Sequence, residues 1–335
     1  MNNMYGFENL CSLNDLSHHG VKGQKWGVRR YQNPDGTLTA AGKGRYLKRL
    51  EGNKVTTVAK GTVMYRSQGK DDETKVQKKL YVAVNEKEAA YYQTIIGAGR
   101  IQKKGEAFVA KYVASNPINI PSVKEQRKIE LSMLKDEEAR RDVVDSLVKK
   151  GYSRSQIAKM TKPVTDGQIF ATGLLTIPLG ILNPGIPIIA TQNKRFQQDN
   201  QLSLIRSTIG DQSATKINEK FENILRERGY QAYRDTNDRN NSLKVKSAIV
   251  VIDPEKNVKF DSSDKITKEN YAKAYVEAKR WRDPKMDKLV TDDDLIKDGE
   301  KEYDSLMKKY AENLIKAEKA KEIDEKLKEI KGGNS

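Results

Sequence analysis

The sequence predicts an α+β fold: a mixed β core with flanking helices, an extended basic N-terminal segment and an amphipathic C-terminal helix. Three observations support this prediction. Short β-rich runs begin near Val55 and return at about 230–260, amphipathic helical patterns separate them, and both ends of the chain differ in composition from a packed core. We therefore expect three regions, at 1–52, 53–264 and 265–335.

The first region, 1–52, lacks the apolar spacing of a packed domain and is predicted to be largely extended. Between Lys22 and Arg49 it carries eight Lys or Arg and one acid, with aromatic residues and glycines among them. This composition is typical of a segment that orders on a partner, or of a solvated basic leader. The candidate docking residues are His18, His19, Lys22, Lys25, Trp26, Arg29, Arg30 and Tyr31.

The second region opens with strand-like runs. In VTTVAKGTVMYRS, which starts at Val55, the alternation places Arg66 on one face of a sheet. LYVAV (80–84) and AFVAKYV (107–113) predict two more strands, and EKEAAYYQTIIG between them predicts a helix.

A long amphipathic helix is predicted to begin near Ser122 and to stop at Gly151. Apolar residues at helical spacing form its buried side: Ile129, Met133, Leu134, Val143, Val144 and Leu147.

The stretch 167–193 contains no charged residue and is long enough to cross a bilayer as a helix. Pro178, Pro184 and Pro187 would interrupt such a helix repeatedly. We interpret the stretch as an apolar insertion packed on the core as a loop or hairpin. Membrane contact and packing between subunits are the alternatives.

The remaining core elements are one helix and the last strands. A helix is predicted from Thr215 to Arg228, with Gly229 as its C-cap. Its apolar stripe consists of Ile217, Phe221, Ile224 and Leu225. The runs GYQAYRD, KSAIVVIDP and KNVKF predict strands, with a turn at Asp253–Pro254.

The third region, 265–335, is predicted to be helical and highly charged. Apolar residues recur at three- and four-residue intervals from Tyr303 to Ile315 and then at Ile323, Leu327 and Ile330. This narrow seam fits a solvated helix that lies on the domain. It fits equally an oligomerisation or docking helix over 295–330.

Composition narrows the possible functions. The net charge of +16 favours polyanionic partners such as nucleic acid, an anionic membrane or an acidic protein. With one cysteine and two adjacent histidines, an intrachain disulfide cannot form, and we expect neither a zinc site nor a Ser-His-Asp triad. The first residues lack the pattern of a secretory signal, so we expect synthesis in the cytoplasm.

The segment HHGVKGQKWGVRRYQNPDG resembles a short signature of head-associated proteins of tailed bacteriophages and prophages of Gram-positive bacteria. The match covers about a tenth of the chain. It implies a virion protein made in the host cytoplasm, whose partners are phage head or portal-region proteins and packaged DNA. In that setting, 167–193 could contact a host membrane.

The order of elements from Val55 to Asp261 resembles the ADP-ribosyltransferase-like fold. The resemblance rests on a strand with Tyr-Arg-Ser, a Tyr-Val-Ala strand, a tyrosine-rich helix and a late Ile-Val-Val-Ile-Asp-Pro strand. It implies that Arg66, followed by Ser67, holds the phosphate and ribose of NAD. It also implies that Tyr81 and Tyr92 clamp the nicotinamide ring; ordinary core packing of these tyrosines is the alternative.

The sequence departs from this family at the catalytic glutamate, which the family places at the start of the late strand. Lys246, Ser247 and Ala248 stand there, and the nearby acids are Glu227, Asp235 and Asp238. The expectation is therefore a noncatalytic virion component that needs no cofactor and docks through its basic segment. The alternative is an injected, NAD-dependent ADP-ribosyltransferase that modifies a host protein.

Overall fold

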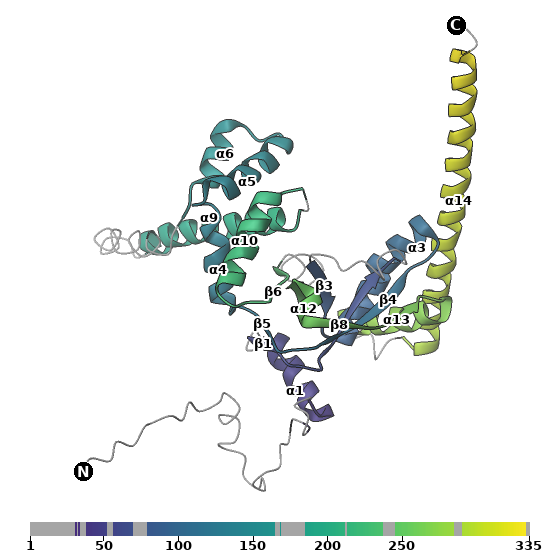
Figure 1. The fold of residues 1–335 in the computed structure, drawn as a ribbon, viewed down its shortest axis with the longest axis horizontal. Coiled ribbons are helices and arrows are strands. Elements are labelled where there is room, and N and C mark those ends of the chain that lie inside the picture. The colour runs from purple at the N-terminus through teal and green to yellow at the C-terminus, as the bar shows by residue number, and fades with distance from the viewer. Residues whose placement is uncertain are drawn as a thin grey trace.

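The computed structural model describes residues 31, 33, 38–51, 56–69, 79–164, 168, 185–211, 213–236, 245–284 and 290–332. These residues form an α+β fold in which helices pack around an antiparallel sheet (Figure 1). The predicted fold class is confirmed at this level.

The main sheet has six strands in the order β6-β7-β3-β2-β4-β8. Every neighbouring pair is antiparallel. Each predicted β-run contributes a strand. The strands are β2 (Val63–Gln68), β3 (Lys79–Ala83), β4 (Phe108–Ala114), β6 (Ala232–Arg234), β7 (Ala248–Ile252) and β8 (Val258–Lys265).

The sheet is split in its middle. β3 pairs with β7 over five residues, and β2 pairs with β4 over six. Between β2 and β3, Tyr65 opposite Ala83 is the one register pair in the described chain. The sheet therefore consists of two three-stranded halves, β6-β7-β3 and β2-β4-β8. Beyond this pair, β2 and β3 diverge in the direction of Ser67 on β2 and Tyr81 on β3.

Helices cover one face of the half β6-β7-β3. A buried apolar cluster on this face contains Val250 and Ile252 of β7. Apolar residues of five helices complete it: α4 (Val123–Ser132), α5 (Glu137–Lys149), α6 (Arg154–Thr161), α9 (Gly185–Ile209) and α10 (Thr215–Glu227). The predicted stripe of α10 packs here, with Ile217, Phe221 and Leu225 buried. Gly229 follows the helix with φ +74°, as the predicted C-cap requires.

The prediction of a single helix from Ser122 to Gly151 is wrong. It is two helices, α4 and α5, separated at residues 133–136. Asp136 is the reason, because its side chain accepts a 3.0 Å hydrogen bond from the backbone N–H of Ala139 and caps a new helix. Five of the six predicted core residues of this stretch are buried, and Val144 is partly buried.

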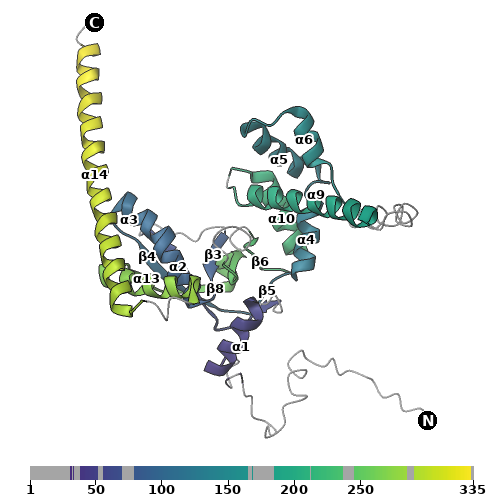
Figure 2. The same cartoon turned by 180° about the vertical axis from the view of Figure 1, so that it is seen from behind.

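The same face of the other half, β2-β4-β8, is covered by different helices. These are α2 (Glu86–Tyr92), a π-helical turn η3 (Gln93–Gly97), α3 (Ala98–Lys104), α13 (Lys268–Arg282) and α14 (Asp292–Gly332). Ile101, Ile266, Tyr271 and Leu306 form the buried cluster there. Figure 2 shows the two helical groups at opposite ends of the sheet.

The opposite face of the sheet packs on a smaller layer. Leu80, Val82, Ile249 and Val251 contact Ile118 and Ile120 of the segment that contains β5 (Ile118–Asn119), which pairs with β1 (Thr57–Val58). Tyr46 of α1 (Ala40–Glu51) packs against this cluster and donates to the carbonyl of Thr57. Residues 40–51 are thus helical, although we expected 1–52 to be largely extended.

Most of the apolar insertion, 167–193, lies outside the described residues. Its last nine residues, 185–193, begin α9, so the expectation of a loop or hairpin is wrong for this part. Pro187 falls in the first turn of α9. Backbone N–H groups in a first turn have no intrahelical hydrogen-bond acceptor, so a proline there removes no helical hydrogen bond. Among the described helices, none combines the length and apolar character needed to cross a membrane.

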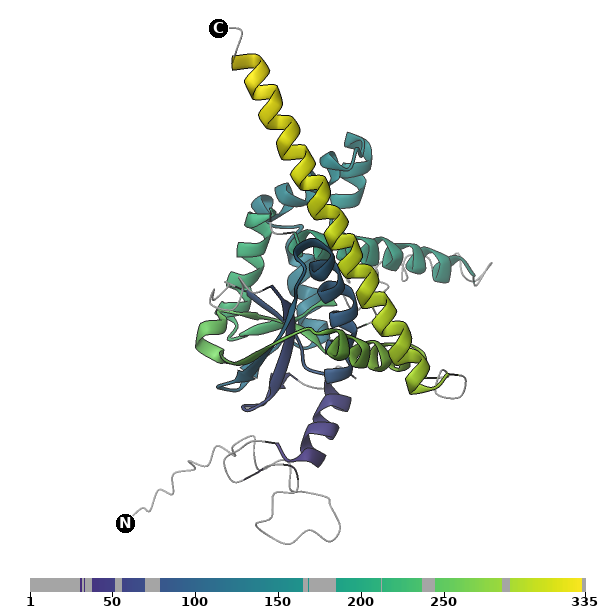
Figure 3. The same ribbon diagram turned by 90° about the vertical axis from the view of Figure 1, so that its right-hand side faces the viewer.

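The helix α14 has two different parts. Its first part packs on the domain, where Leu295 and Leu306 are buried and Tyr310 contacts Gly105. Beyond Asn313 it extends away from the other elements (Figure 3), and Leu314, Ile315 and Ile323 are 46, 53 and 58% exposed. The helix therefore lies on the domain along only part of its length.

Candidate functional site

A cleft of about 370 Å³ lies at the split between β2 and β3. We call it the first cleft. Register places Tyr65, Tyr81 and Ala83 on the same sheet face. The first cleft lies where the two halves of the sheet diverge. Arg66 and Val82, which alternation places on the opposite face, also border it. Its polar lining consists of Tyr65, Arg66, Ser67, Tyr81, Tyr92, Arg100 and Asp235.

The structure brings all four predicted cofactor-binding residues to the first cleft. Arg66 and Ser67 come from β2, Tyr81 from β3 and Tyr92 from the end of α2. Three separate elements thus converge where the sheet divides. The role expected for these residues, binding of NAD, remains a prediction.

Two tyrosines flank Val250 of β7 beneath the cleft, Tyr81 on β3 and Tyr233 on β6. Burial raises the pKa of Tyr81, the negative charge of Asp235 raises it further, and the hydrogen bond with Tyr233 and the charge of Arg66 oppose the rise. The pKa of Tyr233 is raised well above its usual value, and burial is the largest cause of that rise. Both hydroxyls consequently stay protonated at neutral pH.

Asp235 is the acid that the fold brings to the first cleft. It follows β6, and its backbone N–H donates to the carbonyl of Ala248 over 3.1 Å. Of the other acids considered from sequence, Glu227 is exposed at the end of α10, as expected, and Asp238 lies outside the described residues.

The start of β7, where the sequence lacks the expected acid, is held by a carboxylate from another element. Glu88 of α2 is 1% exposed and accepts hydrogen bonds from the backbone N–H groups of Lys246 (2.8 Å) and Ser247 (2.7 Å). The hydroxyl of Ser247 donates to it as well. Glu88 does not line the first cleft, so we interpret it as a support for the strand.

A small cavity of about 30 Å³ continues the first cleft beneath Tyr81 and Asp235. It is lined by a buried ion pair, in which Glu130 of α4 accepts from Arg206 of α9 at 2.8 Å. Gln126 also donates to Glu130, at 2.9 Å. These hydrogen bonds compensate the buried charge and tie α4 to α9 below the cleft.

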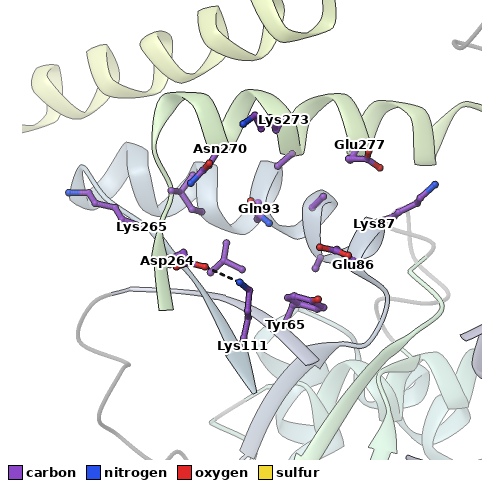
Figure 4. A pocket seen from close by; sticks show the side chains of 15 residues that line it. Tyr65, Glu86, Lys87, Gln93, Lys111, Asp264, Lys265, Asn270, Lys273 and Glu277 are labelled. Carbon is purple, nitrogen blue, oxygen red and sulfur yellow. Dashed lines mark hydrogen bonds and ion pairs between the residues drawn. The ribbon is translucent and has the colours of Figure 1, made fainter. Parts of the chain in front are cut away.

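A second cleft, of about 600 Å³, adjoins the first (Figure 4). The two share Tyr65, Ala89 and Val109. Lys111 and Asp264, which both line the second cleft, form an ion pair at 3.1 Å. Burial raises the pKa of Tyr65, and the charge of Glu86 adds to this rise.

The predicted docking segment lies outside the described residues except for Tyr31. The Tyr31 carbonyl accepts a 3.1 Å hydrogen bond from the N–H of Thr39, and the Arg45 guanidinium lies 4.9 Å from the Tyr31 ring centre. Gly42 has no room for a Cβ, because that atom would lie 2.2 Å from the Tyr31 carbonyl oxygen. The end of the segment is therefore packed against α1.

His18 and His19 also lie outside the described residues. Within the described ranges, no group of three or more His, Cys, Asp or Glu side chains has an arrangement that could hold a metal ion.

Comparison with known proteins gave one match. Residues 12–33 match a family described as a family of unknown function (DUF7211). No curated protein and no solved structure matches the chain. The matched residues contain His18 to Tyr31, the basic aromatic segment that holds the candidate docking residues. They exclude both clefts.

Sequence reasoning missed several residues of the site. Tyr65 and Arg100 line the first cleft, and Glu88 supports the start of β7. Strand alternation could not have identified Tyr65, because it places Tyr65 and Arg66 on opposite faces of the sheet. No local signal distinguishes Glu88 or Arg100, since both act through contacts with elements distant in sequence.

Proposed function

We propose that the first cleft binds NAD and that the protein is an ADP-ribosyltransferase-like effector. The observation that carries this proposal is the convergence of Arg66, Tyr81 and Tyr92 with Asp235 at the split of the sheet. The residues fit the dinucleotide chemically. A guanidinium suits pyrophosphate, and aromatic rings suit the flat nicotinamide.

NAD would supply an ADP-ribosyl group attached to a positively charged leaving group. Within this cleft, Asp235 is the carboxylate available to stabilise positive charge on the sugar. Tyr81, whose hydroxyl stays protonated, lines the cleft together with Asp235. This assignment replaces the missing acid at the start of β7 with one from the neighbouring strand.

The test is transfer of label from tagged NAD into a host lysate by the full chain. Arg66→Ala should lower labelling at least about tenfold, because a charged hydrogen bond contributes about 1.5–3 kcal/mol. Asp235→Asn should lower labelling while NAD binding, measured by equilibrium dialysis, persists. Arg141→Ala, at an exposed position on α5, serves as the matched control. A folded parent that neither binds NAD nor transfers label would overturn the proposal.

A second candidate function is that of a noncatalytic virion component of a tailed phage. The observation that favours it is the family match at 12–33, which coincides with the basic aromatic segment. In this function the segment docks the protein to head or portal-region proteins or to packaged DNA, and the α+β domain is a reused scaffold.

Incorporation into particles tests this second function. Replacing Lys22, Lys25, Arg29 and Arg30 with Glu should remove most of the protein from purified particles, because the segment would then repel a polyanionic partner. A matched charge reversal of four exposed lysines of α14 should leave incorporation unchanged; these are Lys308, Lys309, Lys316 and Lys319. Normal incorporation of the segment variant would rule out docking by charge.

A further inference from the structure

The second cleft has the size and lining of a binding site. Its volume of about 600 Å³ lies within the range of small-molecule pockets. Ala89 and Ala90 of α2 and Ala274 of α13 form an apolar floor, and the small side chains leave the space open. Figure 4 shows charged side chains around this floor.

The charges around the second cleft do not balance locally. Three of its four lysines are already paired with acids: Lys111 with Asp264, Lys265 with Glu106 and Lys273 with Glu269. Within the described chain, the side chains of Glu86, Glu277 and Lys87 have neither an ion pair nor a hydrogen bond. Two uncompensated carboxylates against one ammonium favour a cationic ligand.

An aromatic ring stands beside one of these carboxylates. In Figure 4, Glu86 lies next to Tyr65, and Glu277 lies at the same end of the cleft, away from Lys265. Tyr65 belongs also to the wall of the first cleft. A cation bound at this end would therefore lie next to a ligand bound in the first cleft.

We propose that the second cleft binds an arginine side chain of a partner protein. The guanidinium pairs with Glu86 and stacks on the Tyr65 ring, and the aliphatic stem lies over the alanine floor. Arginine suits this arrangement better than lysine, because its planar group both stacks on a ring and donates two parallel hydrogen bonds to a carboxylate. Glu277 and Lys87 lie at the same end, so the two carboxylates there outnumber the one ammonium and the net charge is negative.

This inference does not depend on NAD binding. It is tested with the full chain and three probes that share a four-carbon stem: butylguanidine, butylamine and pentanoate. Binding is measured by saturation-transfer NMR titration without NAD. The test variant is a double variant that carries both Glu86→Gln and Glu277→Gln. The control is Glu255→Gln, at an exposed position on α12 (Pro254–Asn257).

Butylguanidine should bind the parent more tightly than butylamine, and pentanoate should bind least. The double variant should lose at least about fivefold in affinity for butylguanidine, whereas Glu255→Gln should bind like the parent. Arg66→Ala should leave this binding unchanged while it weakens NAD binding, which separates the two proposals. Equal binding of butylguanidine to parent and double variant, tightest binding of butylamine, or tighter binding of pentanoate would each overturn the inference.

Discussion

Glu88 shows how one buried residue can determine the shape of a site that it does not touch. Its carboxylate satisfies two backbone N–H groups and one hydroxyl at the start of β7. Glu88→Ala leaves these donors buried without an acceptor, so we expect a loss of about 3 kcal/mol in the free energy of unfolding, measured by urea denaturation. Glu138→Ala, whose side chain is 70% exposed, should change stability by less than about 0.5 kcal/mol. Equal midpoints for the two variants would show that Glu88 is not a support.

At the scale of elements, sequence periodicity predicted the strands and α10 because their patterns are local. β7 has five buried residues in a row, and α10 repeats Ile217, Phe221 and Leu225 at four-residue spacing. The break between α4 and α5 was missed, because apolar residues continue through Met133 and Leu134 although Asp136 caps the start of a new helix.

The first cleft was predictable only in part. Arg66, Ser67, Tyr81 and Tyr92 came from a resemblance between element orders, and the structure brings them together. The divergence of β2 from β3 after Tyr65 and Ala83 could not be predicted, because it depends on how two halves of the sheet pack under different helices. The second cleft, which α2 and α13 close, has the same long-range origin.

At the scale of the whole molecule, the second part of α14 is a helix without tertiary support. Most helical stability in proteins comes from the packing of an apolar face, and here Leu314, Ile315 and Ile323 of that face are exposed. Residues 314–331 carry six basic and five acidic side chains, so a second copy meets little net repulsion. We expect the full chain to sediment as a dimer at tens of micromolar. Replacing the three apolar residues with serine should give a monomer whose α+β domain unfolds at the parent's temperature. A parent that sediments as a monomer at these concentrations would contradict the prediction.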